Sequence, residues 1–299
     1  MAKFEIKDGV AIIPEGTTEI SNYAFDDCRT LESIVIPESV TEIGNCAFIS
    51  CTSLKNIAIP KSVTEIGDNA FDGCSSLESI TLPDSVASIG WYAFTGCTSL
   101  KNITLPDSVT FLGENAFSGC TSLESITISN SVTRIDHSAF NDCSSLESIT
   151  IPESVKDIGV GAFRWCTALE SITLPESVKV IGWNAFEGCT SLKNITIPKS
   201  VTRIEQNAFK GCTSLESIVI PTGVTMIGSC AFEGCTSLTT VTLPVGVKKI
   251  EDDVFNKCSA LATIYVPAKK TDYYKKRLLE QLHDKIVELA PEKKTKAKK

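Results

Sequence analysis

A repeat of 23 residues runs through the chain and decides what it can fold into. Shifting the sequence against itself by 23 aligns one leucine per copy without an insertion or deletion. Eleven full units cover residues 8–260, the first of them degenerate, and a partial twelfth covers 261–267. A fixed period of this length predicts stacked units, so the 299 residues form one elongated array instead of compact globular domains. The aligned leucines are Leu31, Leu54, Leu77, Leu100, Leu123, Leu146, Leu169, Leu192, Leu215, Leu238 and Leu261.

Each unit reads L-x-x-I-T-I-P-x-S-V-T-x-I-G-x-x-A-F-x-G-C-T-S. Ile126 and Ile128 alternate with Ser125 and Thr127, which predicts a strand with one buried side and one solvent-facing side. Proline follows this segment in ten of the eleven units and ends the strand, Ser129 being the exception.

The second half of the unit predicts a second extended stretch and a turn. Val132 and Ile135 direct apolar side chains inward, and a corner residue follows that is glycine in most units, such as Gly44. That corner does not strictly require a positive φ, because four units replace the glycine. The segment from Ala47 to Cys51 suits one helical or 3₁₀ turn with its Phe and Cys inside. The four replacements are Ser21, Asp136, Glu205 and Glu251.

Stacking converts the fixed positions into ladders of Leu, Ile or Val, Phe and Cys. With strands about 4.8 Å apart, eleven units give a rod on the order of 50 Å long. The predicted fold class is therefore a repeat solenoid of parallel β-strands with short helical or 3₁₀ turns. Its core is a column that continues from one unit to the next.

The thirteen cysteines follow the repeat. Eleven occupy one position, three residues after Phe, where a thiol serves as a small apolar group. The other two, Cys46 and Cys230, lie eight units apart and cannot pair within one chain. Because the sequence has no C-x-x-C pair and no histidine on the cysteine positions, we expect no metal site and no cofactor.

Both ends depart from the repeat as caps should. Residues 1–13 predict a β-hairpin, with Asp8 and Gly9 in its tight turn. Residues 268–290 predict one amphipathic capping helix with Thr271 as its N-cap. Residues 291–299 have five lysines and no large apolar group, which predicts a disordered basic tail. The apolar face of the predicted helix comprises Tyr274, Leu278, Leu282, Ile286 and Leu289.

Charge is unevenly distributed. The net charge is −8, yet residues 268–299 hold 11 basic and 5 acidic residues, which leaves 17 basic and 31 acidic residues in 1–267. An acidic body repels phosphate, so we expect no nucleic-acid partner beyond weak contact by the tail. No apolar run is long enough to span a membrane, and the absence of a secretory signal after Met1 leads us to expect a cytoplasmic protein.

The pattern L-x-x-I-x-I-P-x-x-V-x-x-I-G-x-x-A-F-x-x-C, repeated over residues 8–267, resembles the BspA-like, or Treponema pallidum type, leucine-rich repeat. The resemblance implies a right-handed curved solenoid of parallel strands. It also implies a bacterial surface or secreted protein that binds host matrix proteins or mediates adhesion. The family supplies no catalytic motif to transfer.

An enzymatic function is not expected. Only His137 and His283 offer imidazole bases, one at a variable surface position and one in the predicted capping helix. The serines and threonines belong to the repeat and have no base beside them, and the glycines do not form a phosphate-binding loop.

Binding must use positions that vary between units, and two groups stand out. The first is an acidic strip along the middle units, which predicts a basic partner if it is more than a solvated face. Other units carry lysine at the strip's main position, as in Lys55, Lys101 and Lys193. The strip consists of Glu124, Glu147, Glu170, Glu153 and Glu176.

The second group is aromatic. Trp91, Tyr92 and Phe111 fall on adjacent units, and Trp165 and Trp183 repeat the pattern further along. Clustered exposed aromatics mark contact sites, whereas buried ones would only fill gaps. We therefore interpret the chain as a monomeric, non-enzymatic scaffold for a protein partner. The alternative is a carbohydrate-binding or adhesion-type surface protein that uses the same aromatics.

Overall fold

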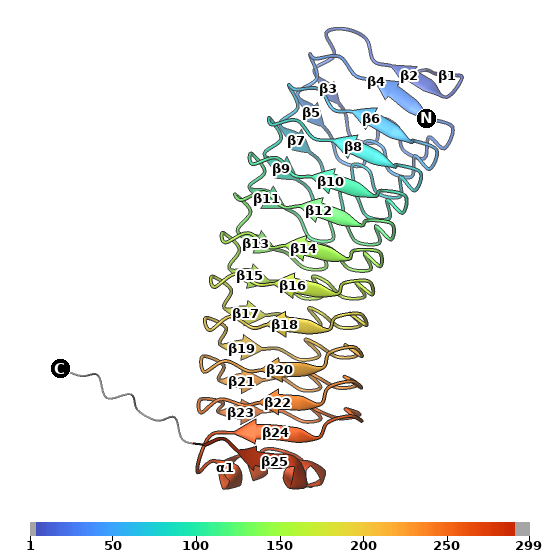
Figure 1. Ribbon diagram of the computed structural model, residues 1–299. Coiled ribbons are helices and arrows are strands. Elements are labelled where there is room, and N and C mark those ends of the chain that lie inside the picture. Colours follow the sequence, from blue (N-terminus) through green and yellow to red (C-terminus); the bar gives the residue numbers. More distant parts are fainter. Residues whose placement is uncertain (1–3, 291–299) are drawn as a thin grey trace, which may run out of the picture.

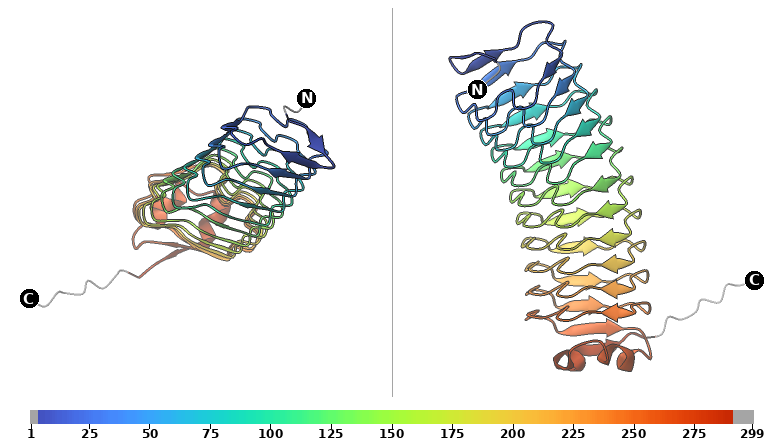
Figure 2. Two further views of the ribbon diagram at one scale, coloured as in Figure 1. Left: turned by 90° about the horizontal axis from the view of Figure 1, so that it is seen from above. Right: turned by 180° about the vertical axis from the view of Figure 1, so that it is seen from behind.

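The computed structural model describes residues 4–290, which form a curved rod of stacked turns of chain. Figures 1 and 2 show the hairpin at one end and the short helical segments at the other. The predicted solenoid of parallel strands is confirmed.

The longer strands form one side of the rod (Figure 1). They pair in parallel with their equivalents one repeat later, except between Ser33–Val35 and Asn56–Ala58 and between Asn194–Thr196 and Ser217–Val219. Ile103 lies in register with Ile126, for example, so the 23-residue period places equivalent side chains directly over one another. Their outward neighbours are mostly exposed, as the alternating pattern predicts. These strands are β2 (Val10–Ile12), β4 (Ser33–Val35), β6 (Asn56–Ala58), β8 (Ser79–Thr81), β10 (Asn102–Thr104), β12 (Ser125–Thr127), β14 (Ser148–Thr150), β16 (Ser171–Thr173), β18 (Asn194–Thr196), β20 (Ser217–Val219), β22 (Thr240–Thr242) and β24 (Thr263–Val266).

The predicted second stretch forms a parallel series of two-residue strands. It divides into a five-stranded sheet, β3 to β11, and a six-stranded sheet, β13 to β23. The second-strand series is therefore interrupted between β11 and β13. These strands are β3 (Glu19–Ile20), β5 (Glu42–Ile43), β7 (Glu65–Ile66), β9 (Ser88–Ile89), β11 (Phe111–Leu112), β13 (Arg134–Ile135), β15 (Asp157–Ile158), β17 (Val180–Ile181), β19 (Arg203–Ile204), β21 (Met226–Ile227) and β23 (Lys249–Ile250).

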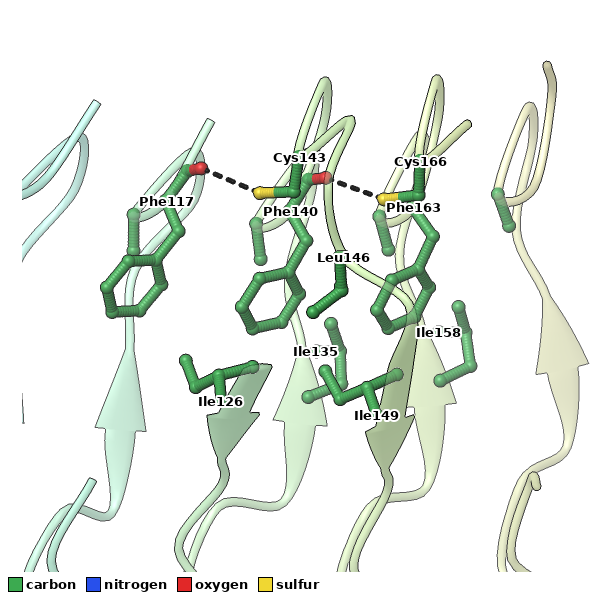
Figure 3. Close-up of a cluster of buried hydrophobic side chains, with 14 of the residues drawn as sticks. Phe117, Ile126, Ile135, Phe140, Cys143, Leu146, Ile149, Ile158, Phe163 and Cys166 are labelled. Carbon is green, nitrogen blue, oxygen red and sulfur yellow. Dashed lines mark hydrogen bonds between the residues drawn. The ribbon is translucent and has the colours of Figure 1, made fainter. Parts of the chain in front are cut away.

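The core is a set of ladders that run along the rod. Phe117, Phe140 and Phe163 are buried and stack nearly face to face at 5.5–5.7 Å between ring centroids. Beside them the Cys143 thiol donates a hydrogen bond to the carbonyl oxygen of Phe117 at 3.2 Å, and the Cys166 thiol does the same to Phe140 at 3.1 Å (Figure 3). No buried side-chain nitrogen or oxygen within residues 4–290 lacks a hydrogen-bond partner. Repetition thus satisfies packing and polar groups together.

The segment before each cysteine is a run of hydrogen-bonded turns and does not extend into a continuous helix. Backbone hydrogen bonds between residues three apart form in this segment, as from the Cys51 N–H to the Phe48 carbonyl at 3.1 Å. The chain cannot continue helically because two residues per unit take left-handed φ, as at Cys46 (55°) and Ser50 (58°). Glycine or asparagine fills these positions in many units because both tolerate that conformation.

The corner glycine is favoured for space and not for its φ. A Cβ built on Gly113 would lie 2.6 Å from the carbonyl carbon of Gly90 and 2.6 Å from the nitrogen of Trp91, both in the preceding unit. Gly113 has no positive φ, which agrees with the expectation that the corner tolerates other residues.

Among the residues described, the chain begins with a short antiparallel pair of strands. β1 (Ile6–Lys7) pairs antiparallel with β2, and Asp8 (φ 51°) and Gly9 (φ 79°) form the turn. β2 then pairs in parallel with β4, which joins the hairpin to the first full repeat.

The C-terminal cap differs from the single helix predicted for 268–290. The chain forms α1 (Thr271–Lys275), a 3₁₀ helix at Glu280–Lys285 and β25 (Ile286–Glu288), which pairs in parallel with β24. Tyr274, Leu278 and Leu282 are buried as expected, but Leu289 is exposed. Thr271 begins α1 and is not its N-cap.

A strand forms at the end of the cap because β24 would otherwise leave unpaired N–H and carbonyl groups at the edge of the sheet. The β-branched pair Ile286 and Val287 suits that pairing. The tail predicted to be disordered, 291–299, lies outside the described residues, as do residues 1–3.

Candidate interaction surfaces

The turn geometry directs the first aromatic group outward. Trp91 follows the corner Gly90, and the backbone N–H of Trp91 donates a hydrogen bond to a carboxylate oxygen of Asp68, one unit earlier, at 2.8 Å. Tyr92 takes the left-handed conformation at φ 60°, and its N–H bonds to the carbonyl of Glu114. With both backbones held, the side chains remain 51% and 42% exposed. They are therefore not gap fillers of the core.

Phe111 lies on the next unit, in β11, in register with Ser88 of β9. Ser88 precedes Trp91 by three residues, with the corner Gly90 between them, so Phe111 lies one unit along the rod from the short strand that leads to Trp91. The Phe111 side chain is 43% exposed. We name Trp91, Tyr92 and Phe111 the N-terminal aromatic patch.

Trp165 and Trp183 are also exposed but are held differently. Trp165 occupies a left-handed turn position, and its ring lies so close over Gly188 that a Cβ there would meet it at 2.4 Å. The Arg164 guanidinium lies 5.6 Å from the ring centroid. The Trp183 indole N–H donates to a carboxylate oxygen of Glu205 at 3.0 Å. Trp183 is equivalent to Trp91 four units later, so the two tryptophans do not form one patch.

The predicted acidic strip follows the stack. Backbone hydrogen bonds link Glu147 to Glu124 at 3.4 Å and Glu170 to Glu147 at 3.1 Å, and all three side chains are exposed. Glu153 and Glu176 are also exposed, each following the proline that ends a long strand. The strip is neutralised at one end, because Lys193 Nζ lies 3.0 Å from Glu170 Oε2.

Sequence reasoning missed a second acidic column. Glu19, Glu42 and Glu65 lie directly in register on β3, β5 and β7, and all three are exposed. Like charges at this spacing repel. The sequence does indicate this column, because glutamate occupies one repeat position in the first three units. In the next two units the same position holds Ser88 and then Phe111.

The long-strand side carries a shallow, open depression of about 410 Å³ over β8 and β10. Its lining includes Ser79, Thr81, Asn102 and Thr104, whose side chains carry hydroxyl and amide groups. Similar groups bond to each other along this side, as from Ser125 Oγ to Asn102 Oδ1 at 2.6 Å. None of the predicted aromatic or acidic residues lines the depression.

The two histidines are not placed as a general base beside a nucleophile. His283 Nε2 lies 3.1 Å from the carbonyl oxygen of Leu278 in the cap. His137 Nδ1 lies 3.5 Å from Glu114 Oε1 on the rod surface. No helix within residues 4–290 is long and apolar enough to cross a membrane.

Stacked parallel strands, one leucine per turn and free buried thiols define a leucine-rich repeat solenoid. The sequence matches the BspA type leucine rich repeat region in six copies, over residues 10–98, 65–192 and 156–282. The chain belongs to this family, which confirms the resemblance drawn from its repeat. Proteins of such repeat families are generally non-enzymatic.

Among solved structures, a leucine-rich repeat protein from Bacteroides ovatus is 30% identical, with 94% of this chain and 92% of that chain covered and a TM-score of 0.49. A leucine rich cell surface protein from Faecalibacterium prausnitzii is also 30% identical, with 89% of each chain covered and a TM-score of 0.49. The pneumococcal vaccine antigen PcpA is 20% identical, with 96% and 94% covered and a TM-score of 0.54, which shows a shared fold. A search of curated proteins found no match.

Proposed function

We propose that this chain is a scaffold that binds another protein, as one copy, through its N-terminal aromatic patch. The observation that carries the proposal is that Trp91, Tyr92 and Phe111 keep 51, 42 and 43% of their surface exposed on adjacent units of a stacked backbone. Tryptophan and tyrosine supply a large share of binding energy at protein interfaces, and a preorganised backbone reduces the entropy lost on binding.

The test is affinity capture with the immobilised full chain, followed by titration of the captured partner. Replacing Trp91, Tyr92 and Phe111 together by alanine should weaken the affinity for that partner at least about tenfold, since hot-spot truncations commonly cost 2 kcal/mol or more of binding free energy. The matched control replaces Trp165 and Trp183, which lie elsewhere on the rod, and should leave affinity unchanged. Equal loss in both variants, or none in the first, would contradict the proposal.

The acidic strip supports a second contact, with a basic partner surface. Glu124 and Glu147 have no salt-bridge partner within residues 4–290, whereas Glu170 is paired with Lys193. Reversing Glu124 and Glu147 to lysine should weaken capture and reduce its dependence on salt. Unchanged capture by that variant would reject the strip as a binding surface.

A carbohydrate ligand is the alternative, and adhesion would suit a family whose members are typically surface or secreted bacterial proteins. Two tryptophans can stack on one short sugar only if they lie close together. Trp91 and Trp183 lie four units apart, about 19 Å by strand spacing, and Trp183 already bonds to Glu205. Geometry therefore favours a protein partner. Glycan-array signal lost on replacing Trp91 or Trp183 by alanine would support the alternative instead.

A further inference from the structure

A histidine and two carboxylates from adjacent units converge beside the interruption of the second-strand series. Glu114 and His137 occupy the same repeat position one unit apart, and Asp136 replaces the corner glycine. One ligand atom from each of the three side chains lies within 4.8 Å of the others. His137 Nδ1 and Glu114 Oε1 are 3.5 Å apart, and all three residues are half-buried.

The short-strand side of the stack is slightly wider at this level, although the long strands of the same two units still pair. β11 does not pair with β13, and the ring centroids of Phe117 and Phe140 are 5.7 Å apart, against 5.2 Å for Phe94 and Phe117. A ligand held by Glu114 of one unit and by His137 of the next would connect the two sheets across this interruption.

We propose that Glu114, Asp136 and His137 bind one divalent transition-metal ion, such as Zn²⁺ or Ni²⁺. Zinc takes imidazole nitrogen and carboxylate oxygen at about 2.0–2.2 Å, which places tetrahedral ligand atoms roughly 3.3 Å apart. The 3.5 Å separation of Nδ1 and Oε1 already approaches that value. An imidazole ligand favours zinc, nickel or copper over magnesium and calcium.

Arg134 competes with the ion. Its Nε lies 3.6 Å from Asp136 Oδ1, and its Nη2 lies 3.3 Å from His137 Nε2. A guanidinium only donates hydrogen bonds, so Nε2 accepts and the imidazole hydrogen sits on Nδ1, facing Glu114. A metal ion must displace that hydrogen and face the positive charge of Arg134. Affinity is therefore moderate, and Arg134 limits it.

The experiment is calorimetric titration of the full chain with Zn²⁺ and, separately, Ni²⁺, after chelator treatment. We expect one ion per chain. His137→Ala and Glu114→Gln should each weaken binding at least about tenfold, as loss of a ligand should cost at least what loss of a supporting group does. His283→Ala removes the other histidine and should bind like the unmodified chain. Circular dichroism checks that each variant is folded.

Arg134→Gln provides the discriminating readout, because removing the competing cation should tighten binding while a nonspecific site would not respond. The proposal is overturned if the unmodified chain binds neither ion, if His137→Ala binds as well as the unmodified chain, or if Arg134→Gln weakens binding. This outcome is independent of partner capture, because none of these residues belongs to the aromatic patch.

Discussion

The thiol of Cys143 donates its hydrogen to the main-chain carbonyl of Phe117 in the preceding unit, at 3.2 Å. Ionisation would break that bond and leave a charge in the apolar core, and burial accordingly raises the pKa of Cys143 well above its usual value. Equivalent bonds recur along the rod, as from Cys97 to Phe71 and from Cys120 to Phe94. The cysteine ladder therefore ties each unit to the one before it.

Removing one central phenylalanine ring should divide the rod. Phe140→Ala leaves a cavity between Phe117 and Phe163 and should cost about 3–5 kcal/mol. Because each unit contacts only its neighbours, we expect two separate transitions in urea unfolding followed by circular dichroism. The matched variant is Phe255→Ala at the end of the ladder, where only the terminal units should melt early. One shared, unbroken transition in both variants would contradict nearest-neighbour stacking.

Corner and turn glycines should differ in how strongly a substitution destabilises the protein. Gly113→Ala places a Cβ against backbone of the preceding unit and should cost about 1–3 kcal/mol as an overpacking change. Gly119 has φ +72°, but a Cβ there would make only ordinary van der Waals contact with the Gly96 backbone, at 3.6 Å, and Asp27, Ser50 and Asp142 hold the equivalent conformation. Gly119→Asn should therefore cost at most about 1 kcal/mol. Thermal unfolding of the two variants decides between steric and conformational roles, and a reversed order would refute the assignment.

Glu233 should make stability depend on acid pH. Lys257 Nζ and Lys210 Nζ lie 2.8 and 3.0 Å from its oxygens and lower its pKa to about 2. A lowered pKa means that its stabilisation is complete above the unfolded value, near 4.5, and is lost as pH falls through about 2. Glu233→Gln should therefore be less stable at pH 7. The loss should be only about 1–2 kcal/mol, because both lysines reach solvent, which screens the two ion pairs.

The difference between Glu233→Gln and the unmodified chain should shrink between pH 4.5 and pH 2, as followed by urea unfolding at each pH. The matched variant is Glu170→Gln, which removes an exposed pair with Lys193 and should change stability by at most about 0.5 kcal/mol. A stability difference that grew on acidification would reverse the predicted sign.

Sequence reasoning succeeded wherever the repeat itself carried the information. A position filled once per unit must stack on its own copies, so the burial of Leu123, Phe140 and Cys143 followed from the period alone. Alternation gave the long strands, and Asp8 with Gly9 gave the hairpin turn.

The failures lie where geometry depends on partners that the period does not specify. Apolar spacing from Tyr274 to Leu289 suggested one helix, but Ile286 and Val287 form a strand that pairs with the open edge of β24. Left-handed turns were hidden because glycine, asparagine and cysteine share those positions. The Glu114, Asp136 and His137 cluster spans two units, and no spacing within one unit reveals it.

Counting thiols tests most directly that the repeated residues form the interior. Of the thirteen cysteines, Cys28, Cys230 and Cys258 are partly exposed and the other ten are buried. Under native conditions near pH 8, a thiol-reactive reagent such as DTNB should label at most those three, and Cys258 only slowly, because burial raises its pKa to about 11. All thirteen should react once the chain is unfolded in guanidinium chloride. Rapid native labelling of ten or more would show that the ladder faces water, and the stacked core described here would be wrong.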